Sequence, residues 1–239
     1  MEILPIARVR NDFPEKFGLP RQAAALSDLP ARVVFEEPYR DKNALRGIEG
    51  FDRLWLIWGF DPLGKGGFSP TVRPPRLGGN VRLGVFATRS PNRPNPLALS
   101  CVVLERVEWD TPEGPVLLIR GADMTDGTAV YDIKPYLPMA DAFPGARAGF
   151  AQSAPERALE VAFPEELERL VPEDKRDVLE KVLRGDPRPA YRKDSGREYG
   201  LAYAGMNIRF TVDGTRLTVT DISKSAAPAK GAAKEGTDP

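Results

Sequence analysis

Histidine is absent from all 239 residues, and cysteine occurs once, at position 101. Without imidazole, the chain cannot form a Ser-His-Asp or Cys-His catalytic set or offer a histidine ligand to a metal. A single cysteine excludes a disulfide within the chain and a zinc site built from thiolates. It is typical of a reducing compartment, so we expect a cytoplasmic protein with no metal.

Long apolar runs are also missing. No stretch approaches the roughly 20 consecutive apolar residues that a membrane span requires. The N-terminal MEILPIARVR lacks the pattern of a signal peptide, so we expect no membrane association. The net charge is zero, from 34 basic and 34 acidic residues, and 41% of the residues are apolar. That composition is typical of a folded globular chain.

Glycine and proline are abundant, with 22 and 24 residues, and they divide the first 140 residues into short strand-like runs. No helical pattern alternates with these runs, which argues against a doubly wound parallel sheet and favours a closed or nearly closed β-barrel. Nearly continuous apolar runs such as LWLIWGF predict strands that are buried on both faces or lie deep in a barrel. The expected strands are 3–10, 31–36, 53–60, 81–87, 99–107, 116–120 and 129–133.

The pattern changes after about residue 150. Residues 164–184 carry a helical apolar stripe, and Pro172 predicts that a second helix begins there. Strand-like runs follow at 206–212 and 216–222. The predicted fold class is mainly β: a small β-barrel main domain (1–150), a smaller α+β C-terminal domain (151–222) and a disordered C-terminal tail (223–239).

Charge is segregated along the chain. Residues 62–104 contain six basic and no acidic residues, whereas residues 155–186 contain ten acidic and six basic ones. The basic stretch can form an electropositive face for a phosphate-bearing partner such as a nucleic acid. Alternatively, its arginines pair with acidic residues from elsewhere in the fold. The candidate nucleic-acid contacts are Arg73, Arg76, Arg82 and Arg93.

Two segments are dense in functional groups. In GVFATRSPNRPNPLALS, three prolines stiffen a loop whose Arg89 and Arg93 suit carboxylates or phosphates, unless the loop is a plain connection with solvated arginines. In DGTAVYDIKPYLP, alternation places Asp132, Lys134 and Tyr136 on one face of a strand. These three residues can form a proton-transfer and charge-stabilising set, or simply an exposed ion pair beside a half-buried tyrosine.

Both segments resemble hallmark segments of the TrmO/YaeB/TsaA-like family, the tRNA adenine-N6 methyltransferases. The likeness spans residues 1–222 and includes EKFGLPRQ, RGIEGFDRLWLIWGFD, PTVRPPRLGGN, FAQSAP and DPRPAYRK. It implies an S-adenosylmethionine-dependent enzyme built on a small β-barrel. The implied enzyme is a homodimer and methylates N6 of N6-threonylcarbamoyladenosine, next to the anticodon of threonine tRNA.

The resemblance also implies a set of cofactor-binding residues. Asp61 departs from the family, in which histidine is common at this position, and Ala98 stands where glycine is common. The implied cofactor residues are Gln22, Phe60, Asp61, Arg89, Leu99, Met124, Thr125, Asp126 and Gly127.

Methyl transfer from a sulfonium depends mainly on alignment, and a poorly nucleophilic nitrogen is helped by a nearby proton acceptor. We expect Asp132 to be that acceptor or an orienting group, Lys134 and Tyr136 to hold the substrate, and the basic stretch to contact the tRNA backbone. Two alternatives remain open: a non-catalytic RNA-binding barrel, and a methyltransferase of the same fold with another substrate.

Overall fold

The structure is a computed structural model. It describes residues 2–19, 29–60, 68–74, 77, 80–152, 158–188 and 196–225. Within these ranges, no helix is long and apolar enough to cross a membrane.

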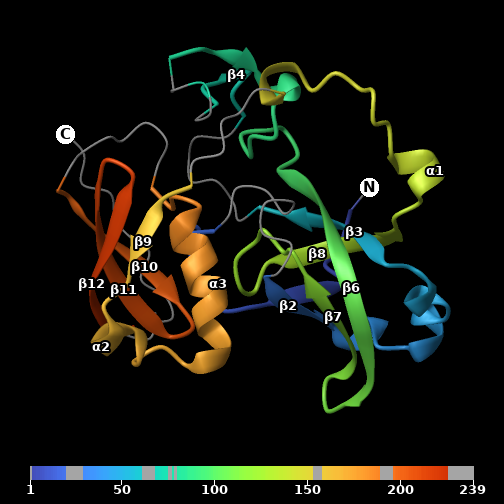
Figure 1. Ribbon diagram of the computed structural model, residues 1–239. Coiled ribbons are helices and arrows are strands. Elements are labelled where there is room, and N and C mark those ends of the chain that lie inside the picture. Colours follow the sequence, from blue (N-terminus) through green and yellow to red (C-terminus); the bar gives the residue numbers. More distant parts are fainter. Residues whose placement is uncertain are drawn as a thin grey trace.

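Six antiparallel strands close a barrel in the order β1-β2-β7-β6-β3-β8 (Figure 1). The predicted barrel is therefore confirmed. The strands are β1 (Ala7–Arg10), β2 (Pro30–Phe35), β3 (Arg53–Gly59), β6 (Leu97–Thr111), β7 (Gly114–Arg120) and β8 (Ala129–Pro135).

Alternation along each strand decides which side chains fill the barrel. In β3, Leu54, Leu56 and Trp58 are buried, while Trp55 and Ile57 point outward and are half-buried. Of the two readings of LWLIWGF, the structure therefore favours a strand within a barrel over one buried on both faces, because an apolar run in a barrel strand still turns every second side chain outward.

Short elements connect the barrel strands. The strand predicted at 81–87 is only two residues long and continues as a 3-10 helix, in which the Thr88 amide donates to Val85 O (3.1 Å). The connecting elements are η2 (Glu37–Tyr39), η3 (Lys42–Leu45), η4 (Ile48–Gly50), β4 (Thr71–Val72), β5 (Leu83–Gly84), η6 (Val85–Ala87), α1 (Pro138–Asp141) and η7 (Gly149–Ala151).

The C-terminal part is a four-stranded sheet in the order β10-β11-β12-β9, in which β9 is parallel to β12. Its helix α3 lies between this sheet and the barrel (Figure 1) and begins directly after Pro172, as predicted. The elements are β9 (Glu160–Ala162), α2 (Glu165–Glu168), α3 (Glu173–Arg184), β10 (Glu198–Tyr203), β11 (Met206–Asp213) and β12 (Arg216–Lys224).

The core of the C-terminal part includes residues from the connection between β1 and β2. Phe13 and Leu29 both lie between the barrel strands β1 and β2, yet both are buried in the core of the C-terminal part. At the other end, β12 continues to Lys224, past the expected start of the tail. Residues 226–239 lie outside the described residues.

Candidate functional site

The outward-facing side of β8, β3 and β6, which we call the outer wall, gathers several predicted site residues. Asp132 of β8 and Leu99 of β6 both pair with Ile57 of β3, one from each side. In the next row, Lys134 pairs with Trp55. Adjacent strands lie only about 4.8 Å apart, so Leu99 shares a small surface with the acidic and basic side chains of β8.

Asp132 and Lys134 form an ion pair on the outer wall. Lys134 Nζ lies 2.9 Å from Asp132 Oδ2, and the Ile133 amide donates to Asp132 Oδ1 at 2.9 Å. The Lys134 side chain is 62% exposed and that of Asp132 is 44% exposed. Both charges therefore remain accessible to a substrate, and the geometry suits a reactive set as well as a simple surface pair.

Tyr136 continues the same face. Its ring centroid lies 5.9 Å from that of Trp55. The Trp55 indole donates to Asp141 Oδ2 (3.0 Å), which also accepts from the Leu137 amide (2.8 Å). The hydrogen bond from Leu137, followed by that from Trp55, lowers the pKa of Asp141. Asp141 thus fixes the aromatic pair at this end of the outer wall.

Other predicted cofactor residues lie at the rim where β3 ends. The Phe60 amide donates to Pro96 O at 3.0 Å, and its ring centroid lies 4.6 Å from that of Trp58. Leu99 is 48% exposed. Met124 is 1% exposed and packs in the barrel core, so a cofactor can reach its backbone but not its side chain.

The 124–127 loop is held by the end of β1. Asp126 Oδ1 accepts from the Asn11 amide (3.0 Å), and Oδ2 lies 3.6 Å from Arg10. Gly127 has φ +78, a left-handed conformation that favours glycine, and its amide donates to Val9 O (2.8 Å). Thr125 Oγ1 lies 3.2 Å from Thr128 Oγ1. Asn11 was not predicted as a site residue.

A buried polar chain at this rim was also missed. The Trp58 indole donates to Ser100 Oγ (2.9 Å), and the Ser100 hydroxyl donates to Asp123 Oδ1 (2.5 Å). Ser100 is 4% exposed, so its hydroxyl is bonded on both sides without water. A serine within the apolar run of β6 was the available signal.

Two of the predicted nucleic-acid contacts, Arg82 and Arg93, form hydrogen bonds within the protein. Arg82 donates to Thr71 Oγ1 at 2.8 and 3.0 Å, and Arg93 donates to Val85 O (3.2 Å) and Thr88 O (2.7 Å). Arg93 thereby braces the proline-rich loop. Arg73 and Arg89 are exposed. None of these four arginines forms an ion pair with an acidic residue in the described ranges, so the alternative of internal pairing receives no support there.

Three predicted residues, Gln22, Asp61 and Arg76, lie outside the described residues.

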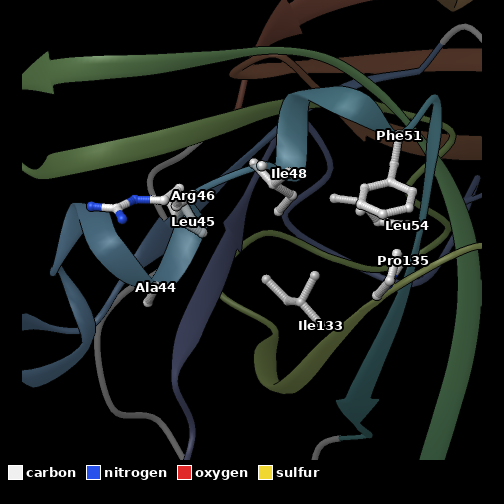
Figure 2. A pocket seen from close by; sticks show the side chains of 9 residues that line it. Ala44, Leu45, Arg46, Ile48, Phe51, Leu54, Ile133 and Pro135 are labelled. Atoms are coloured by element: carbon white, nitrogen blue, oxygen red, sulfur yellow. The ribbon is translucent and has the colours of Figure 1, made fainter.

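A pocket of about 340 Å³ opens at the opposite end of β3 and β8. Figure 2 shows Ile48, Phe51, Leu54 and Ile133 converging on it, while the Arg46 guanidinium points away. None of the predicted site residues lines this pocket. The sequence-derived site therefore lies at the other rim and on the outer wall.

Both parts of the chain match domains of one enzyme family. The profile of the tRNA-methyltransferase O N-terminal domain matches residues 8–142, and that of the TrmO C-terminal domain matches residues 156–225. The chain belongs to the TrmO family. The resemblance found in the sequence is therefore confirmed over the barrel and the C-terminal domain.

TrmO relatives agree in sequence and in structure. The chain is 42% identical over 215 residues to the tRNA (adenine(37)-N6)-methyltransferase of Escherichia coli K12, covering 87% of this chain and 91% of that protein. It is 46% identical over 164 residues to the enzyme of the same name from Eikenella corrodens, covering 68% and 92%. The crystal structure of TrmO from Pseudomonas aeruginosa superposes with a TM-score of 0.73 at 29% identity, covering 93% and 98%.

The hydrogen-bonded chain of Trp58, Ser100 and Asp123 predicts that Ser100→Ala lowers the stability of the protein. This substitution removes the acceptor of the buried Trp58 indole N–H and the hydroxyl that donates to Asp123. It should therefore reduce the free energy of unfolding by about 1–3 kcal/mol. Urea titration measures this loss. Adding Trp58→Phe should cost less than the sum of the two single substitutions, and strictly additive losses would contradict the chain.

Proposed function

We propose that this chain methylates N6 of adenine 37 in tRNA with S-adenosylmethionine as methyl donor. The observation that carries the proposal is the 42% identity to the Escherichia coli enzyme across both domains. The outer wall supports it, because it places a carboxylate, an ammonium and a phenol on one accessible face. We extend the proposal to N6-threonylcarbamoyladenosine in threonine tRNA as the substrate, and to the cytoplasm as the place of the reaction.

The described residues suit S-adenosylmethionine chemically. Leu99 offers an exposed apolar surface for the adenine ring, and the exposed guanidinium of Arg89 suits the cofactor's carboxylate. When bound, the cofactor supplies a methyl group carried on a sulfonium. The protein then needs no electrophile of its own, and its residues act by positioning and by accepting a proton.

Asp132 is the proposed proton acceptor. The N6 atom of the modified base bears a carbonyl group and holds its proton, so it is a poor nucleophile until that proton is removed. With S-adenosylmethionine bound, Asp132 would accept the proton that N6 gives up in exchange for the methyl group, and the cofactor would leave as a neutral thioether once its S–CH3 bond is broken. Lys134, held 2.9 Å from Asp132, keeps that carboxylate in place, and Tyr136 beside Trp55 offers a ring and a hydroxyl to the substrate.

Nucleoside analysis of tRNA tests this function. Cells that lack the protein should lose the methylated threonylcarbamoyladenosine, and the wild-type chain should restore it. Purified Asp132→Asn should methylate roughly 10²–10⁴ times more slowly in a single turnover, because the amide cannot accept the proton. Asp110→Asn is the matched control, since Asp110 is an exposed, ion-paired carboxylate elsewhere on the barrel. An unchanged rate in Asp132→Asn would remove Asp132 from this role.

The basic stretch predicts a salt-dependent contact with the tRNA backbone. Arg73 follows β4 and Arg82 precedes β5, so the two arginines lie at the same end of this two-stranded sheet. The double variant Arg73→Gln/Arg82→Gln should reduce the slope of log affinity against log salt by roughly 1.5. Arg106→Gln/Arg169→Gln is the control, because both arginines are paired with glutamates elsewhere. An unaltered slope would place the tRNA contact elsewhere.

We also propose that the chain is a homodimer joined through its outer wall. The wall presents Trp55, Ile57 and Leu97 in one apolar area, and Leu97 is 36% exposed. A two-fold interface uses the same patch on both subunits. Leu99 and the Asp132–Lys134 pair border this area and are not part of the proposed interface, so they stay accessible to the cofactor and the substrate.

The rate at which the Cys101 thiol is alkylated tests this interface. Cys101 pairs with Trp55 in the wall, and burial raises the pKa of its thiol despite the nearby Arg53, so it should react slowly with iodoacetamide at neutral pH. The reaction should slow further as protein concentration rises. Leu97→Asp should yield a monomer in sedimentation and abolish this concentration dependence. Leu170→Asp, at an exposed leucine of the C-terminal domain, should leave the dimer intact. A monomeric wild type would reject the proposal.

A further inference from the structure

The connection between β1 and β2 leaves the barrel and packs on the C-terminal domain. Phe13 is 2% exposed, and its ring centroid lies 5.0 Å from that of Tyr203. Phe17 stacks on Tyr199 at 6.4 Å. Leu29, at the far end of the connection, is buried in the same core. Both ends of the connection are therefore anchored in the C-terminal domain.

Asp12 is bonded to that domain twice. Its carboxylate lies 2.6 Å from Lys175 Nζ in the first turn of α3, and its carbonyl accepts from the Ala204 amide at 2.9 Å in the turn between β10 and β11. The side chains of Lys175 and Asp12 are only 27% and 29% exposed. Burial alone would lower the pKa of Lys175, but the carboxylates of Asp12 and Asp174 together outweigh burial, and the net effect raises the pKa.

The neighbouring residues bond to the 124–127 loop. The Asn11 side chain donates to Met124 O (2.7 Å), and its amide donates to Asp126 Oδ1 (3.0 Å). The Phe13 carbonyl accepts from the Asp126 amide at 2.8 Å. Three consecutive residues thus connect the loop on one side with the C-terminal domain on the other.

We propose that Asn11 and Asp12 are positioning residues that couple the C-terminal domain to the cofactor-binding loop at 124–127. The cofactor role of this loop rests on the proposed function. Because α3 and the β10–β11 turn hold Asp12, any movement of the C-terminal domain is transmitted to the bonds that place Met124 and Asp126. Coupling of this kind is reciprocal, so a change at the contact between Asp12 and the C-terminal domain alters cofactor binding, and cofactor binding alters that contact.

Lys175→Met in the full-length protein tests the coupling without touching the loop. The proposal predicts that the Asp126 and Gly127 amides exchange hydrogen roughly tenfold faster, because a shielded charge-assisted bond that anchors their partners is lost. It also predicts a several-fold higher Kd and KM for S-adenosylmethionine with an unchanged kcat at saturation. Lys175→Arg, which keeps the ion pair with Asp12, should restore both values.

Arg184→Met is the matched control. Arg184 pairs with Glu180 near the other end of α3, away from Asp12, so this variant should leave loop exchange and cofactor Kd at their wild-type values. Asn11→Ala combined with Lys175→Met should raise the Kd by less than the product of the single effects, since both act along one chain of bonds.

The two readouts separate the coupling from the proposed function. If the Asp126 and Gly127 amides of Lys175→Met exchange hydrogen at the wild-type rate, the coupling is overturned. This holds even if the melting temperature falls, because the contact at Asp12 would then serve stability alone. Faster exchange with an unchanged cofactor Kd would overturn the cofactor role assigned to the loop. A wild-type protein that binds no S-adenosylmethionine would instead overturn the proposed function, while the exchange data still decide whether the domains are coupled.

Discussion

The six strands of the barrel enclose so little space that their own side chains fill it. Val9, Leu56, Val102, Leu117 and Val130 are all completely buried there, as expected, since even eight-stranded barrels are only just wide enough for side chains. A pocket of about 340 Å³ opens at one end of the barrel, where Leu54 and Ile133 line it. The predicted site residues lie instead on the outer wall and at the other rim, whereas the inward-facing side chains of the strands contribute to the stability.

Some of this arrangement is readable from the sequence because it depends on neighbours in the chain. Strand β8 alternates, and that alone places Asp132, Lys134 and Tyr136 on one face. Pro172 predicts the start of α3, because proline is tolerated at the beginning of a helix but disfavoured in its interior. Strand β10 was missed, because Gly200 and Ala202 weaken its strand signal although Tyr199, Leu201 and Tyr203 alternate as buried residues.

The residues that support the site could not be predicted, because their partners are remote in the chain. Asn11 bonds to Met124 across 113 positions, and Ser100 bonds to Asp123 across 23. A single polar residue has no periodicity of its own, so its role depends on which carbonyl or carboxylate the fold brings to it. The family resemblance located the loop around Asp126 but not the strand end that holds it.

The path of the β1–β2 connection has a consequence for how the protein is made. Asp12 and Lys175 are 163 positions apart, and the Phe13 ring packs on Tyr203 of β10. While the chain emerges from the ribosome, the barrel strands can pair once β8 has been synthesised, but the side chains of Asp12 and Phe13 lack these partners until α3 and β10 have been made. Contacts at such separation form late. The residues translated first are thus among the last to reach their final surroundings.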